Sequence, residues 1–350
     1  MKRRLVIPRM PRLKLSHITV TRRMKRIAFA VLALAVVVAA AGIAHGPVVR
    51  VLARTGNPLL DLDKSAWVWD ATLIAPPAAQ TAAPSPTFIE RLTKLNINRL
   101  FLNAGWDKSV REPYLAARPA EYDQFIKAAQ ARGIKVEALY GEPNFAKAEH
   151  WPELLRHVNL VLDYNKQHAN RFSALHLDIE PYGCADYRGN EATILRDYLA
   201  AMRQVKELLR QHNAAERDQL KLVLDLPVWW TAEAPVVDGQ PLVPQLLSLA
   251  DEVVVMNYTA DGDRFVEQGL RWLAAAKGAT ARVSMGMEFQ PETRGATLSA
   301  LTASEVQLYV QSAQKEFRSS RQFAGFAVHH FEPFDQYCLA ISGQGKGEPR

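Results

Sequence analysis

The chain has 350 residues, of which 48% are hydrophobic and 23% are charged, and this ordinary composition excludes a wholly disordered protein. The net charge of +7 is concentrated at one end, because residues 1–54 contain twelve Lys or Arg and no Asp or Glu. The remaining residues carry 31 basic and 36 acidic side chains, so no nucleic-acid partner is expected.

Residues 1–45 have the pattern of an export signal. A basic extension, residues 1–26, precedes an apolar segment, residues 27–45, whose first eighteen residues carry no charge. Such a run is long for the core of a signal peptide and slightly short of the roughly 20 residues that span a bilayer, so a cleaved signal and a membrane anchor both remain open. In either case the basic flank stays in the cytoplasm. We therefore expect an exported protein, periplasmic or in the cell envelope, that contacts the inner membrane through residues 27–45 if they are retained.

Residues 46–64 are expected to form a linker, because Gly and Pro residues interrupt any helix there. From residue 65 to residue 340, short apolar runs alternate with amphipathic helical patterns. The runs that predict strands are 66–72, 97–103, 135–140, 174–180, 220–226, 252–258, 282–288 and 325–331. The patterns that predict helices lie near 85–95, 118–132, 152–168, 190–213, 241–250, 262–277 and 302–318.

Eight strands alternating with seven helices are typical of an α/β fold, the (β/α)8 or TIM barrel. No glycine-rich phosphate loop follows the first strand, which argues against a doubly wound sheet. A barrel places its catalytic groups at the carboxyl ends of the strands. In this chain those ends are rich in carboxylates and aromatic rings, a mixture that suits carbohydrate because rings stack on sugars and polar groups bind hydroxyls.

The fourth strand is the most informative. Strand side chains alternate between faces, so His176, Asp178 and Glu180 point the same way. A carboxylate pair in an apolar strand is costly to bury without a partner or a purpose, and such a pair is what acid–base cleavage of a sugar bond requires. The alternative is a structural acid pair. His176 is expected either to be a satisfied histidine of the barrel interior or, if charged, to pair with Asp178.

Strands four and six resemble those of the chitinase-type glycoside hydrolases of family 18. The Asp-x-Glu end of that family's strand-four motif is present as Asp178 and Glu180, whereas His176 replaces an inward acid. The family's strand-six pattern Met-x-Tyr appears as Met256-Asn-Tyr258. The chain is therefore similar to a divergent member of this family, and the resemblance implies a barrel enzyme that cleaves a β-linked, N-acetylated polysaccharide.

The resemblance also implies residue roles. Glu180 is implied to be the general acid, while Asp178 and Tyr258 assist the substrate's 2-acetamido group, whose carbonyl oxygen attacks the anomeric carbon. Asn257, inside the same strand-six motif, is a candidate for substrate contact.

Two other interpretations stay open. Glu288 ends the seventh strand, and with Glu180 it supplies the two carboxylates, about 5 Å apart, of a retaining glycosidase. Enzymes of that kind usually have Asn before the strand-four acid, and this chain has Ile179. The other interpretation is a non-catalytic barrel that binds carbohydrate or an envelope partner.

Further candidates for substrate binding lie at the strand ends. Asp225 either tunes the acid pair, binds a sugar hydroxyl or makes a structural hydrogen bond. His329 and His330 are adjacent in a strand, so at most one of them is expected to reach the site. The aromatic candidates for stacking on sugar rings are Trp106, Tyr182, Trp229 and Trp230.

No metal or cofactor is expected. The histidines of the helical segments do not share a ligand spacing, and no Gly-x-Ser-x-Gly motif is present. Cys184 and Cys338 are expected to remain unpaired thiols, although an oxidising compartment also permits one disulfide.

Overall fold

The computed structural model describes residues 61–75, 87–105, 112–293 and 295–342. The predicted basic extension and apolar segment, residues 1–45, and all but the end of the predicted linker lie outside these residues. No helix within the described part of the chain is long and apolar enough to cross a membrane.

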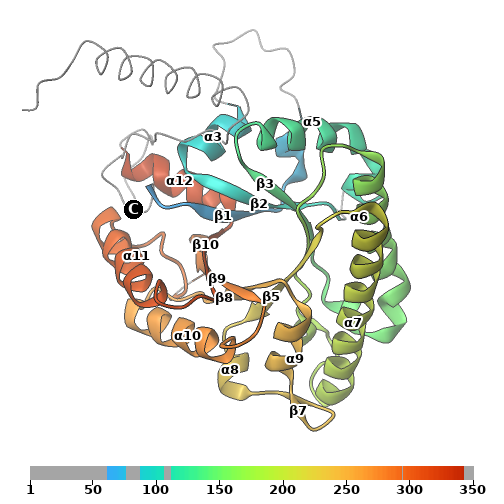
Figure 1. Cartoon of the computed structure of the whole chain (residues 1–350). Coiled ribbons are helices and arrows are strands. Elements are labelled where there is room, and N and C mark those ends of the chain that lie inside the picture. Colours follow the sequence, from blue (N-terminus) through green and yellow to red (C-terminus); the bar gives the residue numbers. More distant parts are fainter. Residues whose placement is uncertain (1–60, 76–86, 106–111, 294, 343–350) are drawn as a thin grey trace, which may run out of the picture. The chain divides into compact units, whose positions relative to one another are not determined.

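Eight parallel strands close into a barrel, as the sequence predicts (Figure 1). In order around the barrel the strands are β1 (Lys64–Val68), β2 (Ile97–Asn103), β3 (Lys135–Tyr140), β4 (Ala174–Leu177), β5 (Lys221–Pro227), β8 (Glu252–Met256), β9 (Arg282–Glu288) and β10 (Phe323–His329), which returns to β1. A short antiparallel hairpin, β6 (Val236–Val237) and β7 (Gln240–Pro241), lies outside the barrel. The predicted (β/α)8 fold is thus confirmed.

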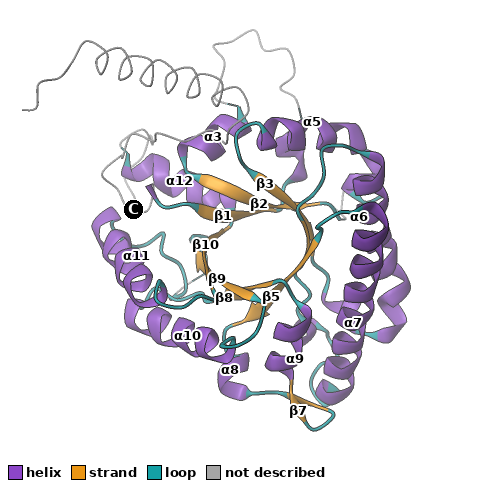
Figure 2. Cartoon of the chain, viewed as in Figure 1, coloured by secondary structure: helices purple, strands orange, loops and turns teal. Residues whose placement is uncertain are grey.

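The helices surround the strands (Figure 2). The longer ones are α3 (Phe88–Lys94), α5 (Pro119–Gln130), α6 (Trp151–Gln167), α7 (Glu191–Glu216), α9 (Leu242–Leu249), α10 (Gly262–Ala275), α11 (Ala303–Phe317) and α12 (Phe331–Ile341). The shorter ones are α4 (Tyr114–Ala117), α8 (Trp230–Glu233) and the 3-10 turns η1 (Ala71–Ile74), η2 (Pro143–Ala146), η3 (Ala148–His150) and η4 (Pro181–Gly183).

Helix α10 illustrates how the sequence forms this layer. Asp261 caps its start by accepting a hydrogen bond from the backbone N–H of Arg264, which satisfies one of the free donors of the first turn. Its buried face includes Phe265 and Gly269, one helical turn apart. A Cβ at Gly269 would lie 2.3 Å from the Phe317 ring, so glycine is what allows α10 and α11 to approach this closely.

Two layers of apolar side chains hold the barrel together. The larger layer lies between the strands and the helices and includes Leu100, Leu175 and Val255. A smaller cluster fills the barrel interior with alternate residues of the strands. Its buried members are Trp67, Phe101, Leu139, Ala174, Val223, Val254 and Ala327. The interior is therefore packed, and the open face for chemistry is the rim where the strands end.

The strand ends differ from prediction where they matter most. Strand β4 ends at Leu177 instead of residue 180, although the N–H of Asp178 still donates to Tyr140 O at 2.8 Å. Strand β8 ends at Met256 rather than residue 258. The predicted acids and Tyr258 consequently lie in the loops just beyond the barrel, where backbone pairing no longer fixes the alternation of side chains.

Candidate active site

Asp178 and Glu180 lie at the rim, immediately after β4. Burial raises the pKa of Asp178 well above its ordinary value, and the charges of Asp225 and Glu180 raise it further. Burial also raises the pKa of Glu180, although a hydrogen bond from Tyr182 opposes that rise. The Oδ1 atom of Asp178 is buried and has no hydrogen-bond partner among the described residues. The pair thus retains a proton more readily than exposed carboxyls do.

Tyr258 comes to the same place from the loop after β8. Its hydroxyl is buried and lacks a hydrogen-bond partner within the described part of the chain. A Cβ at Gly286 would lie 3.1 Å from Cε1 of Tyr258, so the absence of a side chain on β9 makes room for this ring. Burial and then the surrounding carboxylates, Asp225 foremost, raise the pKa of Tyr258 well above its ordinary value. The hydroxyl therefore stays protonated and can donate a hydrogen bond to a ligand.

Glu288, at the end of β9, is already engaged. Its Oε1 accepts a hydrogen bond from the N–H of Gln290 at 2.7 Å, and its Oε2 lies 2.9 Å from Nδ1 of His329. The other ring nitrogen of His329 lies 3.4 Å from Nε1 of Trp69, which can only donate. A proton on Nδ1 of His329, shared with Glu288, satisfies both contacts. Glu288 is 3% exposed, so its carboxylate is poorly placed to attack a substrate.

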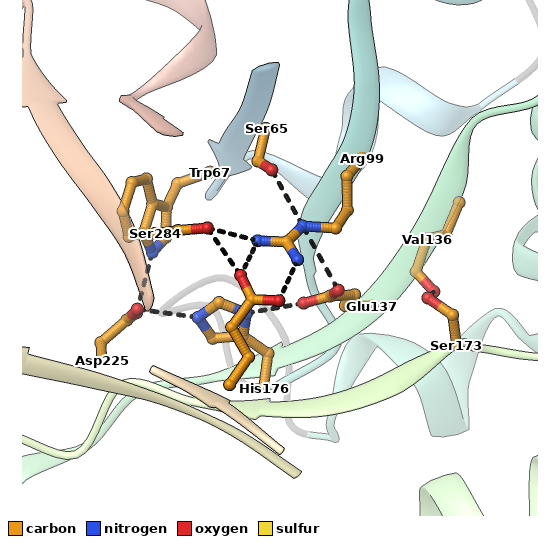
Figure 3. A network of polar contacts seen from close by, with 10 residues as sticks. Ser65, Trp67, Arg99, Val136, Glu137, Ser173, His176, Asp225 and Ser284 are labelled. Carbon is orange, nitrogen blue, oxygen red and sulfur yellow. Dashed lines mark hydrogen bonds and ion pairs between the residues drawn. The ribbon is translucent and has the colours of Figure 1, made fainter. Parts of the chain in front are cut away.

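A network of buried polar side chains crosses the barrel interior next to the rim (Figure 3). His176 is fully buried, with Nδ1 2.9 Å from Glu137 Oε2 and Nε2 2.8 Å from Asp225 Oδ1. Trp67 Nε1 donates to the other oxygen of Asp225 at 2.9 Å. Burial opposes a charge on His176, but Asp225 and Glu137 together raise the pKa of His176 to about 9. The two carboxylates therefore favour the imidazolium form of His176.

The network of buried polar side chains extends to β2 and β8 through Arg99. Both terminal nitrogens of Arg99 donate to Glu252, at 2.6 and 2.7 Å, and Arg99 Nε lies 3.5 Å from Glu137 Oε1. Ser284 Oγ donates to Glu252 at 2.6 Å. Although burial opposes its charge, Arg99 lowers the pKa of Glu252. This bidentate pair holds β2 and β8 together across the barrel.

Two hollows open on either side of β4 at the rim. The β3 hollow, of about 480 Å³, is lined by residues that include Trp69, Asn103, Tyr140, Glu142, Phe145 and Glu153. The β8 hollow, of about 580 Å³, is lined by residues that include Glu180, Tyr182, Trp229, Met256, Tyr258 and Arg264. Both combine aromatic rings with polar groups, as carbohydrate sites do.

The structure gathers some predicted binding residues at the β8 hollow and removes others. Trp229 is 39% exposed and stands 5.0 Å, ring to ring, from Tyr182. Trp230, predicted as a stacking platform, is instead 2% exposed and packs against Tyr198 in the helix layer. Asn257 is fully buried and its Nδ2 donates to Phe265 O on α10, which holds the loop to the helix, while its Oδ1 has no hydrogen-bond partner among the described residues.

The structure also locates most of the remaining predicted residues. His176 and Asp225 are buried beneath the rim and hydrogen-bonded to each other, which fits the interior histidine and the structural hydrogen bond among the predicted alternatives and leaves neither residue as a direct substrate contact. Of the adjacent histidines, His329 faces the site and His330 pairs with Glu332 at 2.8 Å. Trp106 lies outside the described residues. Cys184 and Cys338 are both unpaired and buried.

Sequence reasoning missed the charges inside the barrel. Arg99, Glu137 and Glu252 lie in runs that the sequence analysis treats as apolar strands. A charged residue in each of the runs 97–103, 135–140 and 252–258 is the signal that marks them, but the partners become visible only when the barrel closes. Among the described residues no group of three or more His, Cys, Asp or Glu is arranged to hold a metal ion.

Comparisons with known proteins find solved structures that are similar to this one in fold. No family model and no curated protein matches the chain. The glycoside hydrolase domain of PgaB (BpsB) from Bordetella bronchiseptica is 13% identical, with 80% of this chain and 98% of that chain covered and a TM-score of 0.49. A plant class V chitinase mutant from Cycas revoluta, in complex with (GlcNAc)3, is 12% identical over 80% and 98% of the two chains, with a TM-score of 0.49. ICChI chitinase from Ipomoea carnea is 12% identical over 81% and 100%, with a TM-score of 0.46. At these values the roles of residues rest on the site's own geometry.

Proposed function

We propose that the protein is a glycoside hydrolase that cleaves a β-linked, N-acetylated polysaccharide. Glu180 is the general acid that protonates the glycosidic oxygen. Asp178 and Tyr258 hold the substrate's 2-acetamido group, so that its carbonyl oxygen attacks the anomeric carbon. The observation that carries this proposal is the cluster of Asp178, Glu180 and Tyr258 at the rim, in which two buried polar atoms have no protein partner.

Two unpartnered buried polar atoms beside each other at the rim support a ligand there. Leaving a buried donor or acceptor without a hydrogen bond costs about 1–3 kcal/mol, and a ligand that supplies the missing bond removes this cost. Asp178 Oδ1 and the Tyr258 hydroxyl are both of this kind. An acetamido group offers an N–H for the carboxylate and a carbonyl oxygen for the phenol, which satisfies both atoms at once.

The electrostatics support the assignment of the acid. Burial raises the pKa of Glu180, and a general acid needs a proton to give near neutral pH. Glu180 also lines the β8 hollow, so its carboxyl is accessible from the side on which a leaving group can sit. Asp178 is set deeper, where its Oδ1 is closed off from solvent.

The contacts of Glu288 weigh against the two-carboxylate scheme. Glu288 is 3% exposed and both of its oxygens are held by Gln290 and His329, so a sugar carbon has little access to its carboxylate. We therefore assign Glu288 to the orientation of His329 and the acetamido oxygen to the nucleophile.

The two hollows favour cleavage within a polymer. Because they lie on opposite sides of β4, a chain that passes over Asp178 and Glu180 can occupy the β3 hollow on one side and the β8 hollow on the other. Trp69 and Trp229 provide a ring for a sugar face on each side. Such a site binds several sugar units and releases oligosaccharides.

The test is hydrolysis of a panel of β-linked oligosaccharides, with and without N-acetyl groups, by the full chain. We expect cleavage of the N-acetylated members and a loss of at least about 100-fold for the unacetylated ones, since they lack the internal nucleophile. The Asp178→Asn variant should lose a similar factor on the N-acetylated substrates. Equal rates on both kinds of substrate would contradict acetamido participation.

We also propose that the barrel is exported, with residues 27–45 as its signal or inner-membrane anchor. The support is the basic extension of residues 1–26 followed by an uncharged apolar run. A reporter enzyme that is active only outside the cytoplasm, fused after residue 60, should be active. An inactive fusion would contradict export, and membrane fractionation of the same cells separates anchor from cleaved signal.

A further inference from the structure

In the barrel interior, beneath the rim carboxylates, lies a histidine held from both sides. His176 is fully buried, and its two ring nitrogens face Glu137 on β3 and Asp225 on β5 at 2.9 and 2.8 Å. It occupies the inward position two residues before Asp178. This arrangement places a side chain that can carry a positive charge directly beside the proposed catalytic pair.

We propose that His176 is a positioning residue for the hydrolysis proposed above: clamped between Glu137 and Asp225, it acts as a fixed positive charge that sets the pH range over which Asp178 and Glu180 share their proton. The inference rests on the proposed function, because it concerns the same carboxyl pair. His176 itself touches no substrate and transfers no proton.

The hydrogen bonds fix both the orientation and the charge of the imidazole. Each carboxylate of the clamp can only accept, so both ring nitrogens must carry a proton to satisfy both contacts. Asp225 cannot turn away, because Trp67 Nε1 donates to its second oxygen at 2.9 Å. Glu137 is in turn held beside Arg99 Nε at 3.5 Å. A neutral His176 would leave one buried carboxylate facing a ring nitrogen without a proton.

The position of this charge matters because the neighbouring charges are mostly negative. The charged or titratable groups that face His176, Asp178 and Glu180 come from β2, β3, β5, β8, β10 and the loops after β4 and β8. They are Arg99, Glu137, Glu180, Tyr182, Asp225, Glu252, Tyr258 and His329. Arg99 is committed to Glu252 through two hydrogen bonds, and His329, which is paired with Glu288, lowers the pKa of Glu180. His176 is the cation that acts on Asp178, and it lowers the pKa of Asp178, which burial, Asp225 and Glu180 raise.

Two substitutions in the clamp, formed by His176, Glu137 and Asp225, should shift the pH dependence of activity in opposite directions. His176→Gln keeps hydrogen-bonding groups but removes the positive charge, so the bell-shaped pH profile of kcat/KM should move to higher pH by about one unit. Glu137→Gln removes a negative charge on the far side of the imidazole, so the profile should move to lower pH by about half a unit. The second shift is smaller because His176 is among the charges that act on Asp178, whereas Glu137 is not.

A purely structural role predicts another result. If the clamp only supports the fold, both variants should lower activity by the same factor at every pH and leave the profile in place. Shifts in the same direction, or no shift in either variant, would overturn the proposal. Thermal unfolding of both proteins shows whether each is folded at the pH values used.

A second measurement does not depend on catalysis or on the variants folding. Nitrogen-15 NMR of the full wild-type chain reports the protonation of each imidazole nitrogen, and His176 should be protonated on both at pH 8, where an ordinary histidine is neutral. Glu137→Gln assigns the signal through its shift. A neutral His176 at pH 7 would overturn the clamp even in an active enzyme. A charged His176 in a protein that cleaves no glycan would reject the proposed function and leave the clamp standing.

Discussion

The rim and the interior of the barrel treat buried polar groups in opposite ways. In the interior, His176, Arg99 and Glu252 have hydrogen-bond partners for their charged atoms. At the rim, Asp178 Oδ1 and the Tyr258 hydroxyl are buried without any among the described residues. The two regions are close in sequence, because Asp178 at the rim follows His176 in the interior by two residues. The interior satisfies its polar groups on folding, whereas in the proposed function a ligand supplies the bonds that the rim lacks.

Substitutions in the barrel interior should lower the free energy of unfolding more than substitutions elsewhere. Arg99→Met leaves the buried carboxylate of Glu252 without its bidentate partner, and removing one member of a buried ion pair costs about 3–5 kcal/mol. We expect a loss of this size in the free energy of unfolding, measured with urea. The matched control is Arg210→Met, which breaks an exposed pair with Glu207 on α7 and should leave stability unchanged. Equal effects of the two substitutions would show that the interior pair is not special.

The charge of His176 should make stability depend on pH. The folded pKa is raised to about 9 from an ordinary value of 6.5, so the stabilisation is complete below pH 6.5 and is lost as the pH rises through 9. At about 1.4 kcal/mol per pKa unit, this amounts to about 3 kcal/mol. Urea unfolding at pH 6 and pH 9.5 should show a decline in the wild type that exceeds the decline in His176→Gln by this amount. Equal declines would mean that His176 is not charged in the folded protein.

The rim should affect activity and leave stability almost untouched. Tyr258→Phe removes the unpartnered hydroxyl, which costs the fold no hydrogen bond, so the melting temperature should stay the same or rise. The rate on an N-acetylated substrate should fall about 100-fold, because a donor to the acetamido oxygen is lost. A large fall in melting temperature with full activity would reverse the assignment of Tyr258.

The neighbouring tryptophans provide the finest comparison. Trp229→Ala should raise KM by about tenfold and leave kcat nearly constant, since a stacking surface contributes about 1–3 kcal/mol of binding. Trp230→Ala should instead destabilise the fold by about 3–5 kcal/mol, because Trp230 is 2% exposed. A loss of stability in Trp229→Ala together with a raised KM in Trp230→Ala would contradict the location of the sugar-binding surface at the β8 hollow.

Much of the fold is predictable from the sequence. The strands at 97–103, 135–140 and 282–288 were predicted with their observed ends, because each is an apolar run between polar or turn residues. Helix α12 was missed, since Phe331 follows strand β10 with little change in polarity and the predicted strand ran into the helix. The hairpin β6–β7 is too short to produce a periodic pattern.

The site is predictable only in part, for a physical reason. Asp178 and Glu180 are two residues apart, so the sequence pattern alone predicts that they lie close together, although β4 ends at Leu177, just before them. The clamp around His176 joins residues 39 and 49 positions apart, and Arg99 meets Glu252 across 153 positions. Such contacts depend on barrel closure and register. Trp230 was misplaced because a short helix, α8, turns it inward immediately after β5.

The central claim is that Glu180 donates the proton and no carboxylate of the enzyme bonds the sugar. The most direct measurement is kcat for Glu180→Gln and Glu288→Gln on an N-acetylated oligosaccharide, with mass spectrometry of the quenched reactions. We predict a loss of about 100- to 10,000-fold in Glu180→Gln with an unchanged melting temperature. Glu288→Gln should keep activity within about tenfold of the wild type, with no sugar bound covalently in any sample. A fully active Glu180→Gln, or a glycosyl-enzyme on Glu288 in the wild type, would contradict the account.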